Sequence, residues 1–575
     1  MADLAPHLLR AVEAWSASDP DPQTRAETER LRQAAESGDE AAHAELTDAF
    51  TGRLAFGTAG LRGRLGPGPN RMNRVVVTQA AAGLAAYLRD QVALRQEHGT
   101  KVLVGYDARH GSAEFARDTG EVLAAAGFEA LVTEGPVPTP VVAFGIRHLG
   151  CVAGVVVTAS HNPAQDNGYK VYLADGSQIV PPADAEIAAR IEDVARHPLG
   201  DVARSDAYAR IGAELLRAYA ARAASLVDAE APRTLRWAYT PMHGVGGRLV
   251  LDVVARAGFP APAVVAAQAD PDPDFPTVAF PNPEEPGAID LALALGGEID
   301  ADVVVANDPD ADRCAVAARF PGPGGGWRML TGDELGVLLG DDALRRGTQG
   351  TYACSIVSST QLADVAAAYG QPSASTLTGF KWIGRVPGLA FGYEEAIGYC
   401  VDPEAVRDKD GITTLVRVLA LTAALEAAGT TVADRLDEIA TTYGVVLTGQ
   451  LAIRVDDLAE ITQAMARLRA HPPTTLADEA VEVTDLSDGL SISGGEGGRP
   501  PSSNTVDLPP TDAVRLEGPT VRVVVRPSGT EPKLKAYLEA RVPLDQTRGL
   551  DDDRARAAAT LARLRDEIGG ALGLV

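Results

Sequence analysis

The chain is poor in cysteine and has no long apolar run. Its four cysteines are far apart in the 575 residues, with neither the spacing of a zinc site nor the density of a disulfide scaffold. We therefore expect buried free thiols and a reducing, cytoplasmic location. The sequence has no stretch of roughly 18 apolar residues, so a membrane-spanning helix is not expected. The N-terminal sequence MADLAPHLLRAVEAW lacks a basic segment followed by an apolar core, so a secretory signal is not expected.

Positive charge is also scarce. The chain has 52 lysines and arginines against 78 aspartates and glutamates, which gives a net charge of −26. Non-specific nucleic-acid binding and attachment to an anionic membrane both need a basic surface, so neither partner is expected. An anionic small molecule would need a local cluster of cations. Lysine is the rarer cation and occurs only at Lys101, Lys170, Lys381, Lys409, Lys533 and Lys535.

The remaining composition is that of a globular protein, with 46% hydrophobic and 23% charged residues. At roughly 150 residues per domain, the length predicts about four domains. Residues 1–50 have helical patterns with a break at Asp19–Pro22, so a helical extension is expected to precede the first sheet. We place the domain boundaries at residues 1–205, 206–325, 326–450 and 451–575.

Short β-branched runs alternate with helical segments through most of the chain. This alternation predicts three similar α/β domains with mixed sheets. Their expected strands include residues 101–107, 130–133, 151–157, 235–239, 302–306, 352–357 and 389–392. A smaller C-terminal α+β domain is predicted from strands at 451–455, 520–525 and 535–540 and helices at 457–470 and 551–569. Residues 493–510, rich in Gly, Pro and Ser, predict a mobile loop.

Three polar loops follow buried strands, where ligands bind in open α/β sheets, at residues 158–163, 307–313 and 392–398. In TASHNP, residues 158–163, Ser160 lies where backbone N–H groups can hold a phosphate. Because serine is a poor nucleophile alone, it needs a base or a charged neighbour, and His161 and Lys170 are the candidates.

The second loop, NDPDADR at residues 307–313, has three carboxylates at alternate positions, Asp308, Asp310 and Asp312. Such a group suits a divalent cation with oxygen ligands, although a solvated acidic turn has the same pattern. The Gly and the final Glu of an EF-hand are absent. Arg313 alone cannot neutralise all three acids, so we expect Mg²⁺ completed by a phosphate.

The third loop and two further motifs are each weak by themselves. GYEEAIG, residues 392–398, offers adjacent carboxylates for sugar hydroxyls, and RPSGTEPK, residues 526–533, is a plausible phosphate-binding turn. GTAGLRG, residues 57–63, is a glycine-rich turn that carries Arg62. There is no Walker A, H-E-x-x-H or G-x-S-x-G pattern, so P-loop hydrolysis and the usual zinc peptidase and esterase chemistries lack support.

Taken in order, these five motifs resemble the α-D-phosphohexomutase superfamily, the phosphoglucomutases and phosphomannomutases, over about residues 50–540. GYEEAIG, TGFKWIG at 378–384 and KDG at 409–411 are most similar to the phosphoglucomutase/phosphopentomutase-like branch. The resemblance implies four domains around a central cleft, with a mobile fourth domain. At Ala396, many family members have Ser, which leaves the choice among sugars open.

The resemblance also implies roles for individual residues. The expected catalytic residues are Ser160 as the phosphoserine, His161, Lys170 (for proton transfer) and Arg62. One Mg²⁺ per chain would be bound by Ser160 with its phosphate, Asp308, Asp310 and Asp312. The expected substrate-binding residues are Arg313, Lys381, Glu394, Glu395, Arg526, Ser528, Gly529, Thr530 and Lys535. Five of the six lysines lie in or beside these loops.

The activity implied is that of a phosphosugar mutase. It would move a phosphoryl group between the 1- and the 6- or 5-position of a sugar, through a phosphoserine and a sugar 1,6-bisphosphate that also acts as activator. Phosphomannomutase activity is an alternative, and a Mg²⁺-dependent sugar phosphatase or an inactive sugar-phosphate binding protein are alternatives from other classes. The only expected partner is the small-molecule sugar phosphate, and the protein is expected to be a monomer or dimer.

Overall fold

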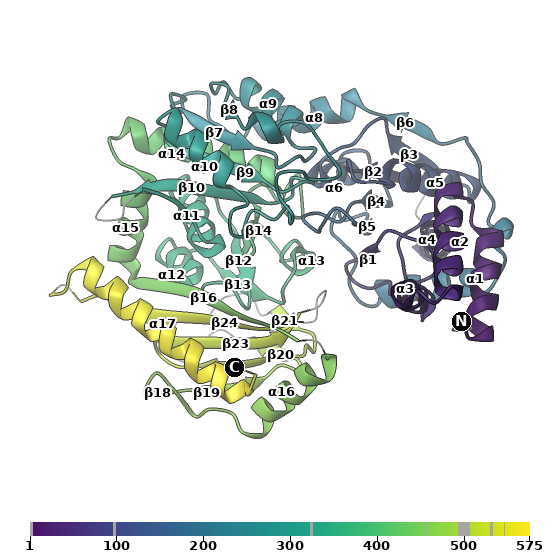
Figure 1. Ribbon diagram of the computed structural model, residues 1–575. Helices are drawn as coiled ribbons and strands as arrows, with labels where there is room; N and C mark the ends of the chain where they lie inside the picture. Colours follow the sequence, from purple (N-terminus) through teal and green to yellow (C-terminus); the bar gives the residue numbers. More distant parts are fainter. Residues whose placement is uncertain are drawn as a thin grey trace. The chain divides into compact units, whose positions relative to one another are not determined.

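The computed structural model describes residues 4–95, 99–321, 326–455, 457–492, 506–528, 533–545 and 547–574 (Figure 1). The chain forms two compact units, each described here by itself. Unit 1 contains Met1–Ala317 and Asp402–Ala420, and unit 2 contains Ala318–Val401 and Leu421–Val575. The chain passes from one unit to the other within strand β10 (Cys314–Phe320), after Val401, and within helix α14 (Gly411–Ala427).

Unit 1 begins with three helices, α1 (Pro6–Ser18), α2 (Pro22–Glu36) and α3 (Glu40–Phe50). The predicted break between the first two is confirmed. It arises because the Asp21 carboxylate accepts a hydrogen bond from the Gln23 N–H at 2.8 Å and Pro22 opens helix α2.

The first sheet of unit 1 has six strands in the order β1-β5-β4-β2-β3-β6. Strand β5 is antiparallel to its neighbours β4 and β1, whereas β4, β2, β3 and β6 are parallel. The strands are β1 (Leu61–Arg64), β2 (Lys101–Tyr106), β3 (Glu129–Thr133), β4 (Ala153–Val157), β5 (Asp166–Leu173) and β6 (Ala209–Ile211). The helices of this segment are α4 (Arg74–Arg95), α5 (Ser112–Ala125), α6 (Thr139–His148) and α7 (Ala183–Ala195).

The second sheet has the order β11-β10-β9-β7-β8, with β7 parallel to β8 and β9 and with β10 antiparallel to β9. Its strands are β7 (Trp237–Thr240), β8 (Ala263–Val264), β9 (Val303–Asn307), β10 and β11 (Gly326–Met329). The associated helices are α8 (Ala213–Ala224), α9 (Gly247–Arg256) and α10 (Asp290–Glu298).

Unit 2 contains the other two large sheets. The third sheet has the order β13-β12-β14-β15, in which only β15 is antiparallel. Its strands are β12 (Thr351–Ser355), β13 (Ser373–Thr376), β14 (Leu389–Glu394) and β15 (Gly398–Cys400). The helices are α11 (Gly332–Arg345), α12 (Gln361–Ala368), α13 (Phe380–Ile383) and α15 (Val432–Tyr443).

The C-terminal sheet is fully antiparallel, in the order β16-β24-β23-β22-β19. Helix α17 (Leu550–Leu572), yellow in Figure 1, packs on β16 and β24. The strands are β16 (Val445–Arg454), β19 (Glu482–Asp485), β22 (Val514–Glu517), β23 (Val521–Pro527) and β24 (Lys533–Val542). The remaining elements are α16 (Leu458–Ala470) and the short pairs β17 (Thr475–Leu476) with β18 (Glu479–Ala480) and β20 (Leu490–Ile492) with β21 (Val506–Leu508).

The predicted fold class is confirmed: three α/β segments with mixed sheets precede a smaller α+β segment. The three α/β segments share one pattern, a parallel strand followed by a loop and an antiparallel partner. These pairs are β4 with β5, β9 with β10, and β14 with β15. Each predicted functional loop of the α/β segments therefore connects two adjacent strands.

Two predicted strand boundaries differ clearly from the structure, and one of them is the start of β16, at Val445 rather than at residue 451. The other is the end of the predicted strand 389–392: residues 393 and 394, expected in a loop, belong to β14 because Gly392 pairs with Cys400 and Glu394 with Gly398. The free, buried state predicted for all four cysteines is confirmed. Of the predicted mobile loop, residues 493–505 lie outside the described residues. Among the helices that the structure describes, none by itself is long and apolar enough to cross a membrane; α14 and α15 together pass that test, with a bend of 88° between them.

Candidate active site

Ser160 lies in the turn between β4 and β5. Its backbone φ of 53° is in the left-handed region, which a residue with a side chain rarely adopts. The Ser160 N–H donates a hydrogen bond to Thr158 Oγ at 2.8 Å, which holds this conformation. The Ser160 hydroxyl donates to Asp308 Oδ2 at 2.8 Å and lies 3.2 Å from His161 Nδ1. The turn therefore directs the serine to the acidic loop.

Arg109 holds the serine turn, although no sequence motif pointed to this residue. Its buried guanidinium donates hydrogen bonds to the carbonyl oxygens of Ser160, Asn162, Pro163 and Asp166, at 2.7 Å for Ser160. The signal that could have found it is the polar stretch directly after β2, because β2 is the parallel neighbour of β4.

The three aspartates of the second loop are completely buried between β9 and β10. One oxygen from each lies within 4.8 Å of the others. The chain brings them together because Ala311, between the last two, has a left-handed φ of 54°. Asp310 is also tied to helix α6 of the first α/β segment, since Thr139 at the start of α6 donates a hydrogen bond from its hydroxyl to Asp310 Oδ2 at 2.6 Å.

These aspartates fit a divalent cation. Among the described residues, Oδ1 of Asp310 and Oδ1 of Asp312 are buried and have no hydrogen-bond donor. Buried carboxylate oxygens without donors are unfavourable, and a hard cation such as Mg²⁺ takes such oxygens as ligands. These two oxygens without donors and the clustering of the three carboxylates together make this loop the candidate metal site.

Two lysines approach the same aspartates. Lys170 Nζ, from β5, lies 2.8 Å from Asp310 Oδ2 and 2.9 Å from Asp312 Oδ2. Lys409 Nζ lies 3.3 Å from Asp312 Oδ2. Lys409, in the KDG motif, is one of the five lysines expected in or beside the functional loops, but no individual role was predicted for it. Lys409 and Asp312 are 97 residues apart in the chain, so no local sequence pattern could indicate that they are in contact.

The charges of this cluster shift its pKa values in opposite directions. Burial, and then repulsion from Asp312, raises the pKa of Asp310 to about 6. Burial also opposes ionisation of Asp312, but Lys170 and Lys409 outweigh it and lower the Asp312 pKa. Burial lowers the pKa of Lys170, but the attraction of Asp310 and Asp312 outweighs this effect, so the pKa lies above the usual value. The ammonium therefore stays protonated in this arrangement.

The remaining predicted residues of unit 1 surround the serine. Burial, followed by the charges of Arg313 and Arg62, holds the pKa of His161 well below its usual value, so the imidazole is neutral. Arg62 donates to the side-chain oxygen of Asn162 at 3.3 Å. The Arg313 N–H donates to Asp308 Oδ1 at 3.0 Å, and its guanidinium lies 3.7 Å from Glu284.

The other predicted site residues lie in unit 2. Glu394 ends β14, and Glu395 Oε2 accepts hydrogen bonds from Ser355 at 3.0 Å and Ser358 at 3.1 Å. Burial, and then Asp333, raises the pKa of Glu395. Lys381 lies in the short helix α13.

The predicted phosphate-binding turn connects β23 and β24. Arg526 and Lys535 are paired directly across these strands, and the Ser528 N–H donates to the Lys533 carbonyl oxygen at 2.8 Å. Like charges directly opposite each other are unfavourable unless an anion lies near both. Gly529 and Thr530 lie outside the described residues.

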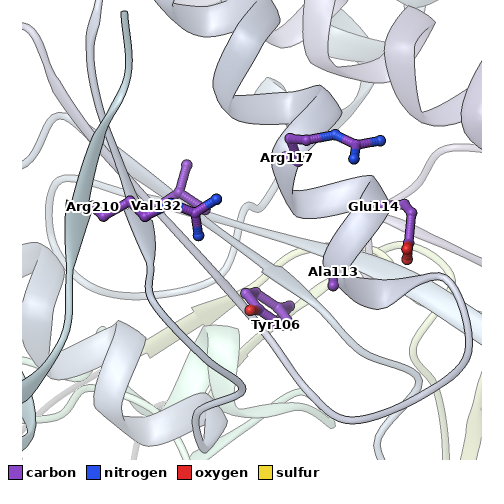
Figure 2. A pocket seen from close by; sticks show the side chains of 6 residues that line it. All are labelled: Tyr106, Ala113, Glu114, Arg117, Val132 and Arg210. Carbon is purple, nitrogen blue, oxygen red and sulfur yellow. The ribbon is translucent and has the colours of Figure 1, made fainter. Parts of the chain in front are cut away.

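A cavity of about 200 Å³ lies elsewhere in unit 1. Figure 2 shows its lining: Tyr106 at the end of β2, Val132 of β3, Arg210 of β6, and Ala113, Glu114 and Arg117 of α5. It includes none of the predicted site residues and is distinct from the serine and aspartate cluster.

Comparison with known proteins identifies the class of fold and site. Four family descriptions match successive parts of the chain: Phosphoglucomutase/phosphomannomutase alpha/beta/alpha domain I at residues 53–197, domain II at 217–320, domain III at 331–443 and the C-terminal domain at 451–557. The chain therefore belongs to the phosphoglucomutase/phosphomannomutase family. It is an enzyme, a phosphosugar mutase that acts as an intramolecular phosphotransferase.

Individual relatives agree with this assignment. A protein of Haemophilus influenzae described as a probable phosphomannomutase is 46% identical over 82% of this chain and 93% of its own length. The human phosphopentomutase is 33% identical over 87% of each chain. The crystal structure of a phosphoglucomutase/phosphomannomutase family protein from Burkholderia thailandensis shares the fold, with a TM-score of 0.67, 21% identity and coverage of 91% of this chain and 98% of the other.

Proposed function

We propose that this mutase interconverts the 1-phosphate and the 6- or 5-phosphate of a sugar, as a phosphoglucomutase or phosphopentomutase does, with Ser160 as the residue that carries the phosphoryl group. The observation that carries the proposal is the 2.8 Å hydrogen bond from Ser160 Oγ to Asp308, inside a buried group of three carboxylates and two lysines. This placement gives a nucleophile next to charges that suit phosphoryl transfer, in which positioning and charge neutralisation dominate.

Two half-reactions account for the isomerisation. First, a free hydroxyl of the sugar monophosphate attacks the phosphorus on Ser160. The bond from phosphorus to Ser160 Oγ breaks, the hydroxyl loses its proton, and Ser160 gains one, which leaves a sugar bisphosphate. Then Ser160 Oγ attacks the other phosphate. Its own proton leaves, and the sugar oxygen that loses the phosphoryl group is protonated, so phosphoserine is restored.

Two residues near Ser160 have different roles in the proton transfers, one as acceptor and the other as donor. Neutral His161, with Nδ1 at 3.2 Å from Ser160 Oγ, is placed to accept the serine proton. Lys170 carries a proton between Asp310 and Asp312 and is suited to donate rather than accept one. This arrangement supports Lys170 as the acid that protonates the departing sugar oxygen.

The proposed cofactor is one Mg²⁺ per chain, held by Asp308, Asp310, Asp312 and the phosphate on Ser160. The orphaned Oδ1 atoms of Asp310 and Asp312 support these ligands. When bound, Mg²⁺ would neutralise negative charge on the transferred phosphoryl group. Arg62 and Arg313 would add to the same neutralisation from the protein side.

The sugar and its second phosphate are assigned to residues of unit 2. We propose that Glu394 and Glu395 accept hydrogen bonds from sugar hydroxyls, with Lys381 as a further contact. The non-reacting phosphate would be bound by Arg526, Ser528, Gly529, Thr530 and Lys535. The cross-strand pairing of the cations Arg526 and Lys535 supports this anion site.

We also propose four domains with the boundaries 1–205, 206–325, 326–450 and 451–575. The ranges of the four family matches, each of which lies inside one of these segments, support the division.

The test is an assay of glucose 1-phosphate, mannose 1-phosphate and ribose 1-phosphate, each with catalytic sugar bisphosphate and Mg²⁺. The proposal expects turnover of the glucose or the ribose compound. Turnover of mannose 1-phosphate alone would make the chain a phosphomannomutase. Steady release of inorganic phosphate without isomerisation would identify a phosphatase and refute the proposal.

Ser160→Ala tests the nucleophile. The variant should lose turnover and protein phosphorylation together, because the phosphoryl carrier is removed. Ser225→Ala is the matched control, since that exposed hydroxyl bonds only the carbonyl oxygen of Arg222 among the interactions described, and it should keep both. Persistent phosphorylation of Ser160→Ala would show that another residue is the nucleophile.

A further inference from the structure

Lys409 is held at Asp312 by a chain of buried contacts that begins on β5. Tyr172 OH donates a hydrogen bond to Asp408 Oδ2 at 2.7 Å. The other oxygen of that carboxylate, Oδ1, lies 3.6 Å from Lys409 Nζ, and the Lys409 N–H donates to it at 2.8 Å. Lys409 Nζ in turn lies 3.3 Å from Asp312 Oδ2. The Asp408 carboxylate thus connects a tyrosine to a lysine of the site.

Strand β5 explains why this tyrosine can act there. Lys170 and Tyr172 are two residues apart, so their side chains extend from the same face of the strand. Lys170 contacts Asp312 directly at 2.9 Å, while Tyr172 reaches the same aspartate through Asp408 and Lys409. One strand therefore sets the positions of both lysines.

The segment that carries Lys409 is fitted closely to the aspartate loop. The Gly411 N–H donates to the Ala311 carbonyl oxygen at 3.2 Å. A Cβ on Gly411 would lie 2.2 Å from the Arg313 carbonyl oxygen, so only glycine fits there. The backbone places Lys409 near Asp312, and the direction of its long side chain is then set by the charges around it.

A second donor supports the same carboxylate. Gln178 Nε2 donates to Asp408 Oδ2 at 2.8 Å, so this oxygen receives two hydrogen bonds. Tyr172 and Asp408 are both almost completely buried, with 0% and 1% of their surface exposed. Because water cannot replace the tyrosine hydroxyl at this depth, its loss leaves the carboxylate with one fewer donor and freer to rotate.

We propose that Tyr172 is a positioning residue of this mutase, which orients Asp408 so that Lys409 Nζ stays at Asp312 beside Lys170. The inference rests on the proposed function of this cluster. Tyr172 takes no part in bond formation; it fixes how the charge of Asp312 is shared between two ammonium groups. Phosphoryl transfer is sensitive to such placement, since small displacements of charged groups reduce the rate substantially.

The test is Tyr172→Phe, which removes one hydroxyl and keeps the ring. We expect kcat to fall roughly tenfold, the order of a buried hydrogen bond to a charged group, with KM changed less than about twofold. Tyr352→Phe is the matched control. Its hydroxyl is also on a buried side chain and donates to the Thr348 carbonyl oxygen at 2.9 Å in unit 2, and its loss should leave kcat unchanged.

A double-mutant cycle separates positioning from a structural effect. Lys409→Met should lower kcat by itself, and Tyr172→Phe added to it should produce no further fall, because the group that the tyrosine positions is gone. A further tenfold fall in the double variant, or wild-type kcat in Tyr172→Phe, would overturn the inference. If Tyr172→Phe does not fold, Gln178→Met removes the other donor to Asp408 and should lower kcat in the same direction.

These outcomes are distinct from a failure of the proposed function. If the wild-type protein isomerises none of the three sugar phosphates, the proposed function is wrong. If the wild-type protein is active and Tyr172→Phe matches it in kcat, only the positioning role is wrong.

Discussion

At the scale of the residue, lysine and arginine are not interchangeable in this site. Six of the 52 cationic side chains are lysines, yet two of them, Lys170 and Lys409, contact Asp312. A lysine ammonium is a compact charge on a flexible stem, whereas a guanidinium is a broad planar fork. Lys170 Nζ reaches Asp310 and Asp312 at 2.8 and 2.9 Å in a space that is almost closed to solvent. We therefore expect that a guanidinium cannot make both contacts in this space.

Lys170→Arg should therefore lower activity although it keeps the charge. We expect kcat to fall at least tenfold, because the guanidinium must displace one of the carboxylates and cannot be tuned as a proton donor. The measurement is steady-state turnover of the sugar phosphate that proves active. Lys101→Arg, at the start of β2, is the matched control and should retain activity. Equal activity of Lys170→Arg and wild type would exclude a specific role for the ammonium.

At the scale of the element, the predicted strands are largely confirmed because buried parallel strands are continuous β-branched runs. Residues 155–157 and 303–305 are such runs of three valines, and both lie in strands with every residue buried. The predicted end of β14 was wrong because the polar residues after Gly392 have the local pattern of a turn. Residues 392–394 are a strand because they pair with β15, and a local sequence pattern does not reveal that pairing. The same reason explains why β16 begins at Val445 rather than at residue 451.

Helix α11 contains a buried carboxyl that should make the stability of unit 2 depend on pH. Asp333 Oδ1 accepts hydrogen bonds from the Ser359 N–H at 2.6 Å and Tyr393 OH at 3.0 Å. Burial raises the pKa of Asp333 to about 6, above its ordinary value of 3.8. Between these values the folded state binds more protons than the unfolded state. The contribution of Asp333 to stability is therefore greatest below pH 4 and is lost as the pH rises through about 6.

Asp333→Asn removes this titration. The wild-type protein should lose up to about 3 kcal/mol of stability from this group between pH 4 and 7.5, and the variant should lose less over that range. Thermal unfolding midpoints at pH 4.5, 6 and 7.5 measure the difference between the two proteins. Asp252→Asn, at an exposed position, is the control and should follow the wild type. A constant difference between Asp333→Asn and wild type at all pH values would contradict the expectation.

At the scale of the whole molecule, a net charge of −26 coexists with a local cluster of cations in unit 1. The cations that lie near the three buried aspartates are Arg62, Arg109, Lys170, Arg313 and Lys409. In the proposed function, this cluster would let an acidic protein hold an anionic phosphate, and a divalent cation would balance the remaining carboxylate charge.

Mg²⁺ should therefore stabilise the folded protein in the absence of substrate. At a concentration of 100 times its Kd, a ligand that binds only the folded state adds about 2.7 kcal/mol, which should raise the unfolding midpoint by a few degrees. Asp310→Asn should abolish the shift, because one ligand loses its charge, whereas Asp252→Asn should keep it. Calorimetry with NaCl at equal ionic strength separates binding from screening. An identical shift in Asp310→Asn would place the cation elsewhere.

The amino-acid sequence was sufficient to predict the family, the order of the elements and the candidate site residues that lie in contiguous motifs, Ser160 and the three aspartates among them. It could do so because each motif is short and directly follows a strand with a clear apolar pattern. Tertiary contacts were needed to show that Arg109 and Tyr172 belong with them and that Lys409, expected beside the loops, contacts Asp312. Their partners are 51 to 236 residues away in the chain, and contacts across such separations depend on which strands are neighbours in a sheet and which loops meet at its edge.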